Sequence, residues 1–388
     1  MRRSDERILT THTGSLPRPA ALTQLYARRA RGETVDSDAI ETGAREAVTD
    51  IVGKQIAAGI DVINNGEQSR DSFVLYLRDR LTGLGGSGSR RMSEDIDRYP
   101  EFKRQFQARV ANKDVVSVRD RLPKTIGPLA YKDRALVERE CADFAAALAP
   151  NHGHYTEAFL TAPSPGILAA IVQNEYYDSL ENYLAAIGAS LRVEYEAIIE
   201  AGFLLQLDCP ELGLERHTSY RDRPLREFVE FVELVIAAIN TALAGIPRDR
   251  VRLHVCWGNY EAPHDSDVEL GAILPAILDA EVGALVLPFA NPRHAHEFKA
   301  FKTTRLEDDQ MLIAGVIDTL TNFVEHPEVV ADRIERIAAA VGDPRRVLAG
   351  TDCGFETSAG MGRVADDVAW AKLKALTEGA RIASQRLF

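Results

Sequence analysis

Residues 203–257 read FLLQLD (203–208), then LREFVEFVELVIAAINTAL (225–243), then VRLHVCW (251–257). The outer two are short apolar runs of strand length, whereas the middle one repeats apolar residues with the period of an amphipathic helix. Short strands separated by long helices are typical of parallel strands joined by crossover helices. This part of the chain therefore predicts an α/β fold with a parallel sheet.

The same alternation extends in both directions from this stretch. Toward the end of the chain, strands are predicted at 284–289, 311–317 and 347–352, and helices at 267–280, 327–341 and 364–382. Toward the beginning, three further strands are predicted at 8–12, 61–65 and 158–161. Eight parallel strands with right-handed crossovers predict a (β/α)8 TIM barrel, with residues 1–388 as a single domain. A doubly wound open sheet is the alternative.

Residues 83–134 do not fit this repeat. They contain the glycine-serine segment GLGGSGSRRMSEDIDRYP (83–100), a polar helix-like run and the strand-like TIGPLAY (125–131). We interpret 83–134 as a loop and hairpin insertion after the second strand unit, within the same domain. Such a segment is equally consistent with a lid over the mouth of the barrel and with a surface segment that has no role in the site.

The composition is that of a globular enzyme with a small-molecule partner. The 388 residues carry a formal net charge of −12, which argues against a nucleic-acid or anionic-membrane partner. We see no apolar run of membrane-spanning length, and the N-terminal MRRSDERILTTHTG lacks the apolar core of a signal peptide, so a cytoplasmic location is expected. Four scattered cysteines are too few for a disulfide framework and are expected to be reduced thiols.

Polar residues follow five of the eight predicted strands. They are His12, the NNGEQSR run (64–70), Asp208, His254 with Cys256, and Asp352 with Cys353. The active sites of TIM barrels lie at the C-terminal ends of the strands, where residues that are distant in sequence converge. These positions therefore predict one shared site.

The His254-Val255-Cys256 triplet is the strongest chemical signal among them. Two residues separated by one on a strand project to the same side, so that an imidazole and a thiolate can bind one ion. Cys353 offers a third ligand on the same rim, although a free cysteine alone is more often a small buried apolar residue. One histidine and two cysteines form a zinc set whose fourth position stays open for a substrate. A thiol bound there would lose its proton near neutral pH.

The motifs along the chain resemble the catalytic barrel of the cobalamin-independent methionine synthases and their single-barrel relatives, including epoxyalkane:coenzyme M transferase. The resemblance runs in order from about residue 8 to residue 355 and rests on THTGSLPRP, INNGEQSR, LTAPSPG, LQLDCPE, HVCWGN, PFANPRHAHE and AGTDCGF. It implies that zinc is held by His254, Cys256 and Cys353. It also implies that Ser15 and Glu67 contact the substrate thiol and that Asp208 binds its amino group.

One position departs from the methionine synthases. They carry a glutamate that can also ligate zinc near the end of the strand after the HxC pair, where this chain has Pro288. Two cysteines and one histidine are the pattern of the coenzyme M transferase branch.

Several other residues are candidates for the site. Arg18, Arg70 and Arg293 are candidates for binding a carboxylate or sulfonate group, each against the alternative of a surface salt bridge. Trp257 is a candidate for stacking on a flat donor, or else a buried barrel aromatic. Cys209 is interpreted as a structural thiol. The candidates for a general acid are His12, His264, His294 and His296.

The sequence therefore predicts a zinc-dependent thiol S-alkyltransferase. A small thiol, either homocysteine or coenzyme M-like, would attack a methyl-folate-like donor, or alternatively an epoxide. A metal-free decarboxylase of the uroporphyrinogen decarboxylase-like barrel and a non-catalytic zinc or thiol-binding protein are the alternatives of other classes. Homo-oligomerisation is left open.

Overall fold

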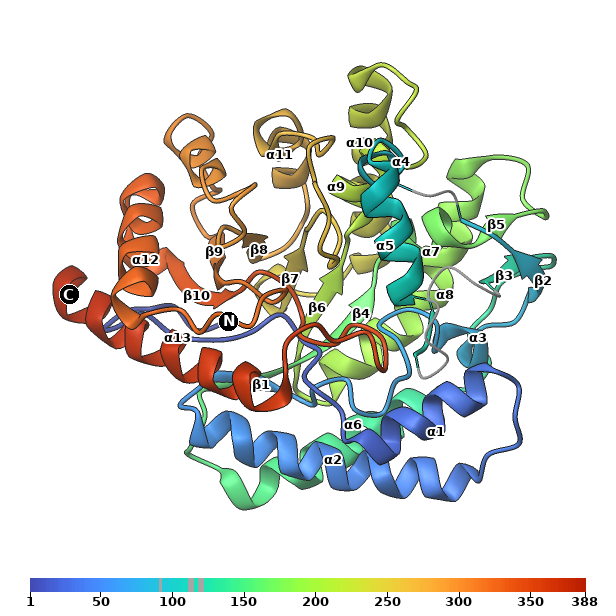
Figure 1. Ribbon diagram of the computed structural model, residues 1–388, viewed down its shortest axis with the longest axis horizontal. Helices are drawn as coiled ribbons and strands as arrows, with labels where there is room; N and C mark the ends of the chain where they lie inside the picture. Colours follow the sequence, from blue (N-terminus) through green and yellow to red (C-terminus); the bar gives the residue numbers. More distant parts are fainter. Residues whose placement is uncertain (91–92, 111–114, 118–121) are drawn as a thin grey trace.

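The computed structural model of the protein describes residues 1–90, 93–110, 115–117 and 122–388. Its centre is a curled parallel sheet with the strand order β1-β4-β6-β7-β8-β9-β10, and helices cover its outer face (Figure 1). The strands are β1 (Val62–Asn64), β4 (Glu157–Pro163), β6 (Leu204–Asp208), β7 (Val251–His254), β8 (Ala284–Pro288), β9 (Met311–Ile317) and β10 (Val347–Thr351). The predicted α/β class is confirmed.

The two edges of this sheet meet on the segment predicted as the first strand. Thr10 forms a parallel bridge to Ala349 of β10, and Thr11 forms one to Val62 of β1. Only these two residues of the segment pair with the sheet, so it forms isolated bridges and not a regular strand. Since both edge strands pair with it, the arrangement is TIM-barrel-like and differs from an open doubly wound sheet.

The helices agree closely with the amphipathic patterns in the second half of the chain. The longer ones are α1 (Ala20–Ala30), α2 (Ser37–Ala57), α5 (Pro100–Val110), α6 (Ala135–Leu148), α8 (Leu180–Glu200), α10 (Leu225–Leu243), α11 (Leu270–Leu278), α12 (Pro327–Val341) and α13 (Asp366–Leu387). The shorter ones are α3 (Leu77–Arg80), α4 (Glu94–Asp97), α7 (Pro165–Ile171) and α9 (Glu211–Leu214). The bounds of α10 and α12 are those predicted from the sequence.

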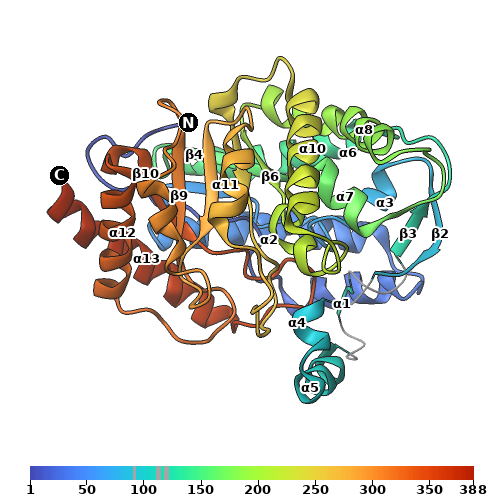
Figure 2. The ribbon, with the colours of Figure 1, turned by 90° about the horizontal axis from the view of Figure 1, so that it is seen from above.

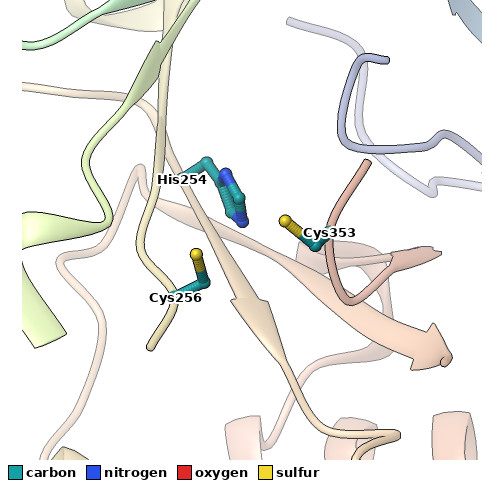
Figure 3. Close-up of side chains that lie close together, drawn as sticks. All are labelled: His254, Cys256 and Cys353. Carbon is teal, nitrogen blue, oxygen red and sulfur yellow. The ribbon is translucent and has the colours of Figure 1, made fainter. Parts of the chain in front are cut away.

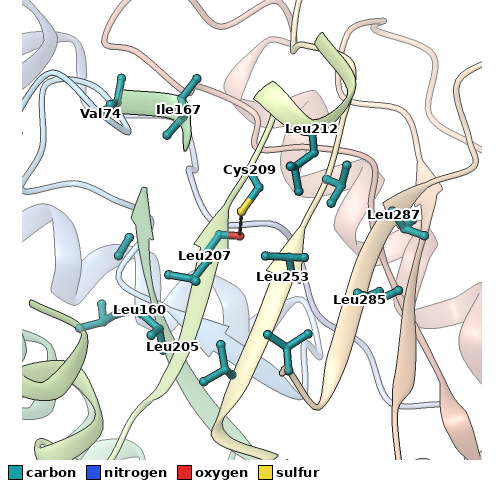
Figure 4. Packing of buried hydrophobic residues seen from close by; sticks show 14 of the residues in the cluster. Val74, Leu160, Ile167, Leu205, Leu207, Cys209, Leu212, Leu253, Leu285 and Leu287 are labelled. Carbon is teal, nitrogen blue, oxygen red and sulfur yellow. Dashed lines mark hydrogen bonds between the residues drawn. The ribbon is translucent and has the colours of Figure 1, made fainter. Parts of the chain in front are cut away.

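Two apolar layers hold the sheet. The larger one lies between the strands and the helices, where Leu205, Leu207 and Leu253 pack with residues of the surrounding elements (Figure 4). The smaller one takes residues from six strands and from the Ile8–His12 segment: Leu9, Val62, Phe159, Leu204, Ala284, Val286, Met311, Ile313 and Leu348. Strands buried on both faces explain why these runs are almost continuously apolar.

Strand β7 contributes a charged residue to the smaller layer. The guanidinium of Arg252 lies 3.8 Å from the ring centroid of Phe159 and donates hydrogen bonds to Gln206 Oε1 (2.7 Å) and His12 O (2.6 Å). A buried cation needs such partners to offset its desolvation. Arg252 thereby ties the first segment of the chain to the middle of the sheet.

The described parts of 83–134 form a second, small sheet and a helical excursion. β2 (Leu84–Gly88) pairs antiparallel with β3 (Leu122–Thr125), and β3 pairs with β5 (Gln173–Asn174). Of the strand-like motif TIGPLAY (125–131), Thr125 is the last residue of β3 and the residues after it lie beyond that strand. Helices α4 and α5 project away from the main sheet (Figure 2). That 83–134 is an insertion stays a prediction, and part of it lies outside the described residues.

Within the described ranges, every helix is too short or too polar to cross a bilayer.

Candidate active site

Three side chains with zinc-ligand chemistry meet at the C-terminal end of the sheet. His254 is the last residue of β7, Cys256 follows two positions later, and Cys353 lies two positions beyond the end of β10. One imidazole nitrogen and the two sulfurs lie within 4.8 Å of one another, and all three residues are buried. Figure 3 shows that the imidazole and both thiols point toward one common place.

The orientation of His254 leaves one ring nitrogen available at this place. Its Nδ1 lies 3.1 Å from Asp208 Oδ1, at hydrogen-bond distance. Its Nε2 is buried and has no hydrogen-bond partner among the residues that the structure describes. Histidine ligands of metals commonly donate their second N–H to a carboxylate, which fixes the tautomer and the ring orientation. A free Nε2 beside two thiols therefore fits a divalent metal.

The electrostatics favour a thiolate at Cys256 beside the imidazole of His254, whereas the neighbouring Cys256 and burial raise the pKa of Cys353 well above its usual range. Burial alone would lower the pKa of His254, but the neighbouring Cys256 and Asp208 raise it to about 10. The thiol of Cys353 and the imidazole of His254 lower the pKa of Cys256 well below its usual range, although burial opposes this. A thiolate is the form of cysteine that binds zinc.

Cys353 is positioned by the preceding residue. The carboxylate of Asp352 accepts hydrogen bonds from three consecutive backbone N–H groups, those of Phe289 (3.0 Å), Ala290 (2.9 Å) and Asn291 (2.6 Å). This carboxylate fits against Gly315, where any Cβ would lie 2.4 Å from Asp352 Oδ1. The loop after β8 is thus tied to the end of β10. The side chain of Pro288, the last residue of β8, offers no ligand atom.

A cavity of about 500 Å³ opens beside His254, Cys256 and Cys353, and the acids Glu67 and Asp208 line it with them. Glu67 Oε1 accepts a hydrogen bond from Thr161 Oγ1 (3.0 Å), while its Oε2 is buried without a partner in the described part of the chain. Ser15 Oγ is likewise buried and unpartnered there, and Ser15 also lines the cavity. Burial and the carboxylate of Asp208 raise the pKa of Glu67 to about 7.

The backbone at Glu67 is strained in order to place this side chain. Glu67 has a φ of 56°, in the left-handed region, and the side chain of Asn65 accepts a hydrogen bond from its N–H (3.0 Å). Space for the carboxylate comes from Gly14, where a Cβ would lie 2.7 Å from Glu67 Oε1. Strain of this kind is typical of functional positions.

The rest of the cavity wall is largely apolar. It includes side chains from the loops after the strands and from described residues of 83–134, for which a lid over the barrel mouth was one of two interpretations. They include Phe73, Val74, Phe106, Ile167, Ile171, Leu214 and Met361. Arg90 is the one lysine or arginine among the described residues of the wall, and it is paired with Glu215.

Three candidates from the sequence do not line this cavity. Arg18 donates to Glu356 O (2.6 Å) and Glu67 O (3.0 Å), so that it braces the loop that carries Glu67. Arg70 is buried in ion pairs with Glu140 and Glu194. The Nε2 of His12 lies 2.7 Å from Gln55 Oε1, and burial lowers the pKa of His12 to about 4. These contacts make the three residues supports of the fold.

Three more candidates lie on the other side of the ligand triplet. Trp257 and His294 line a small pocket next to the cavity and stack with ring centroids 4.1 Å apart. His264 lines the same pocket.

The remaining candidates lie apart from the triplet. Arg293 and His296 are exposed. Cys209 is fully buried in the larger apolar layer (Figure 4).

The sequence did not point to several residues of the site. The apolar cavity wall, Asp352 as the support of Cys353, and Gly14 as the space for Glu67 were all missed. The positive φ of Glu67 has no sequence signature, but the glycine of THTGS, between two strand-end candidates, could have suggested a close approach.

The comparisons with known proteins agree in one family. The sequence model of the cobalamin-independent synthase catalytic domain matches residues 8–375. The methionine synthase of Saccharolobus solfataricus is 25% identical over 382 residues, covering 97% of this chain and 95% of that protein. The methionine synthase of Sulfurisphaera tokodaii is also 25% identical, over 97% of this chain and 93% of its own length.

A solved structure has the same overall architecture. A B12-independent methionine synthase from a Shewanella species, in complex with selenomethionine, superposes with a TM-score of 0.72 at 21% identity. The match covers 98% of this chain and 99% of that one. At this identity the likeness supports the fold.

Proposed function

Because this chain belongs to the family of the cobalamin-independent synthase catalytic domain, we propose that it is a zinc-dependent methyltransferase that alkylates the thiol of a small amino thiol. The observation that carries the proposal is the convergence of His254, Cys256 and Cys353 beside the acids Glu67 and Asp208 at one cavity. Zinc held by the three ligands would lower the pKa of a thiol at its open position.

The two acids favour a thiol that carries a cationic amine. Glu67 Oε2 is buried without a partner among the described residues, and Asp208 lies close enough to raise the pKa of Glu67. An ammonium group between them would relieve this repulsion and fill the hydrogen-bonding capacity of Glu67. Ser15 Oγ offers a further polar contact on the same wall. Homocysteine has the required thiol and amine.

The apolar remainder of the cavity suits an alkyl donor. A volume of about 500 Å³ is within the usual range for ligand sites, and its wall could hold a flat, methyl-folate-like molecule against the thiol. Excluding water there would strengthen the electrostatic contacts of Glu67 and Asp208 with the substrate. Among the described residues, Asp208 also orients His254, so it would couple amine binding to the geometry of the ligands.

A second function is favoured by Pro288 alone. Because that residue replaces a ligating glutamate, epoxide opening by a coenzyme M-like thiol is the alternative. The sulfonate of such a thiol would face Glu67 and Asp208, and the one described arginine of the wall is paired with Glu215. The electrostatics therefore favour the amino thiol. No observation favours the decarboxylase or the non-catalytic alternative.

The two functions are separated by a thiol panel. With a methylated folate as donor, the zinc-loaded protein is expected to consume homocysteine and form methionine, and to leave 2-mercaptoethanesulfonate unchanged. Methionine formation can be followed by mass spectrometry. Consumption of 2-mercaptoethanesulfonate with an epoxide, without methionine formation under any methyl donor, would reverse the assignment.

A pH profile tests the role of Glu67. An ammonium group is held by the ionised carboxylate, which predominates above its pKa of about 7 and is lost below it. The KM for the amino thiol is therefore expected to fall about tenfold between about pH 6 and pH 8. In Glu67→Gln, the KM should no longer fall between these pH values. An identical pH profile in both proteins would show that Glu67 does not hold the ammonium group.

A further inference from the structure

A second group of metal-ligand side chains lies behind Trp257, apart from the three ligands described above. It comprises His217, His264, Asp267 and His294, which we call the imidazole cluster. These residues come from three loops, which follow β6, β7 and β8. Their side chains are almost completely buried, with at most 6% of each exposed. Three imidazoles around one carboxylate are a donor set that binds divalent transition metals in proteins.

The inward-facing atoms of the cluster all approach Asp267. His264 Nδ1 lies 3.0 Å and His294 Nε2 lies 2.7 Å from Asp267 Oδ2. His217 Nδ1 lies 3.3 Å from the other oxygen, Asp267 Oδ1. One ligand atom from each of His264, Asp267 and His294 falls within 4.8 Å of the others.

The outward-facing nitrogens of two histidines are occupied by acceptors. His264 Nε2 lies 2.8 Å from the carbonyl oxygen of Tyr260, and His294 Nδ1 lies 2.8 Å from Glu297 Oε2. A neutral imidazole has a single N–H, which these acceptors use. The inward-facing nitrogens of His264 and His294 would then turn their lone pairs toward the carboxylate of Asp267. Because lone pairs and a carboxylate repel one another, a positive charge must lie between these nitrogens and the carboxylate. This arrangement is the usual support of metal-bound histidine, whose second N–H is given to a carboxylate or carbonyl group.

Protons alone leave part of the cluster unsatisfied. A proton on His294 Nε2 can bridge this ring to Asp267 Oδ2, which lies 2.7 Å away. His217 Nδ1 and Asp267 Oδ1 lie 3.3 Å apart, yet neither atom makes a hydrogen bond, to the other or to any other residue that the structure describes. Buried polar atoms of this kind cost free energy unless a ligand satisfies them.

We propose that the imidazole cluster is a second, structural metal site, in which His264, His294 and Asp267 bind a divalent transition-metal ion and His217 completes the coordination. Zinc is the ion that best suits three imidazoles and one carboxylate in a closed site. The ion would pin the three loops together. Because His294 stacks on Trp257, the neighbour of Cys256, it would also hold the loop that carries Cys256.

The site is tested by cobalt titration of the metal-stripped protein, with absorbance as the readout. About two equivalents of Co²⁺ per chain are expected. One equivalent should give the intense near-ultraviolet band of thiolate ligation, from the site with Cys256 and Cys353. The other should give only weak visible absorption, as nitrogen and oxygen ligands do. Saturation at about one equivalent, all of it with thiolate absorption, would overturn the proposal.

Variants assign each equivalent to its site. Asp267→Ala and His264→Ala are expected to lose only the equivalent without the thiolate band, whereas Cys256→Ser should lose the thiolate band and keep the other. Retention of both equivalents in Asp267→Ala would contradict the assignment. These readouts do not depend on turnover, so the result is separable from the proposed methyl transfer.

A second measurement covers the case in which the cluster variants fail to fold. In Cys256→Ser, which lacks the thiolate site, the metal-loaded protein should melt at a higher temperature than the stripped protein, because an ion bound only by the folded state stabilises it. Equal melting temperatures would show that the cluster is held by protons alone.

Discussion

Cys256→Ser and Cys353→Ser are each expected to lower turnover by a factor on the order of 10³ or more. Each substitution replaces one of the three proposed zinc ligands by a hydroxyl, which is a poor ligand for this ion. The fold should survive, because both cysteines lie beyond the ends of β7 and β10 and outside the two apolar layers. Steady-state kinetics, together with the thiolate band of the cobalt-loaded protein, measure both consequences.

A matched control is Cys141→Ala. Cys141 is also buried, but it lies in α6 and outside the group of His254, Cys256 and Cys353. This variant should keep the thiolate band and the turnover of the parent protein. Full activity and an unchanged band in Cys256→Ser or Cys353→Ser would remove that cysteine from the site.

Glu67→Gln is expected to raise the KM for an amino thiol by a factor of about 10 to 150, with a smaller effect on kcat. The amide keeps the size of the side chain and its contact with Thr161, but it loses the charge that would hold an ammonium group. A hydrogen bond to a charged group contributes about 1.5–3 kcal/mol, which corresponds to this change in KM. Initial rates over a range of thiol concentrations separate KM from kcat.

Glu211→Gln provides the comparison for this variant. Glu211 is fully buried, and burial raises its pKa to about 8, but it does not line the cavity and instead accepts a hydrogen bond from Ser164 Oγ (2.6 Å). Its KM should stay close to that of the parent protein. If the two variants changed KM equally, or if Glu67→Gln left it unchanged, the amine would be bound elsewhere.

The strand and helix order could be predicted because the apolar pattern of each segment is local. The runs at 311–317 and 327–341 reproduce β9 and α12 residue for residue. The first strand was harder, because it forms only isolated bridges at Thr10 and Thr11. The closeness of His254 and Cys256 was expected from strand alternation. In the structure β7 ends at His254, and Val255 N–H still donates to Val286 O (3.1 Å), which extends the pairing by one residue.

Side-chain partners from distant segments could not be read in this way. Arg18 and Arg70 follow strand ends as an anion-binding residue would, yet their partners Glu356 and Glu140 lie far along the chain. No local pattern distinguishes a cation that braces a loop from one that binds substrate. The place of His217 in the imidazole cluster could not be predicted for the same reason. Its contact with Asp267 joins residues that lie 50 positions apart in the sequence.

The most direct test of the account is a crystal structure of the zinc-loaded protein with homocysteine, with anomalous diffraction recorded at the zinc edge. We expect an anomalous peak between His254 Nε2 and the sulfurs of Cys256 and Cys353, with the substrate sulfur as its next ligand and the amine between Glu67 and Asp208. The absence of a peak at that place, or a substrate sulfur bound away from it, would contradict the proposed chemistry.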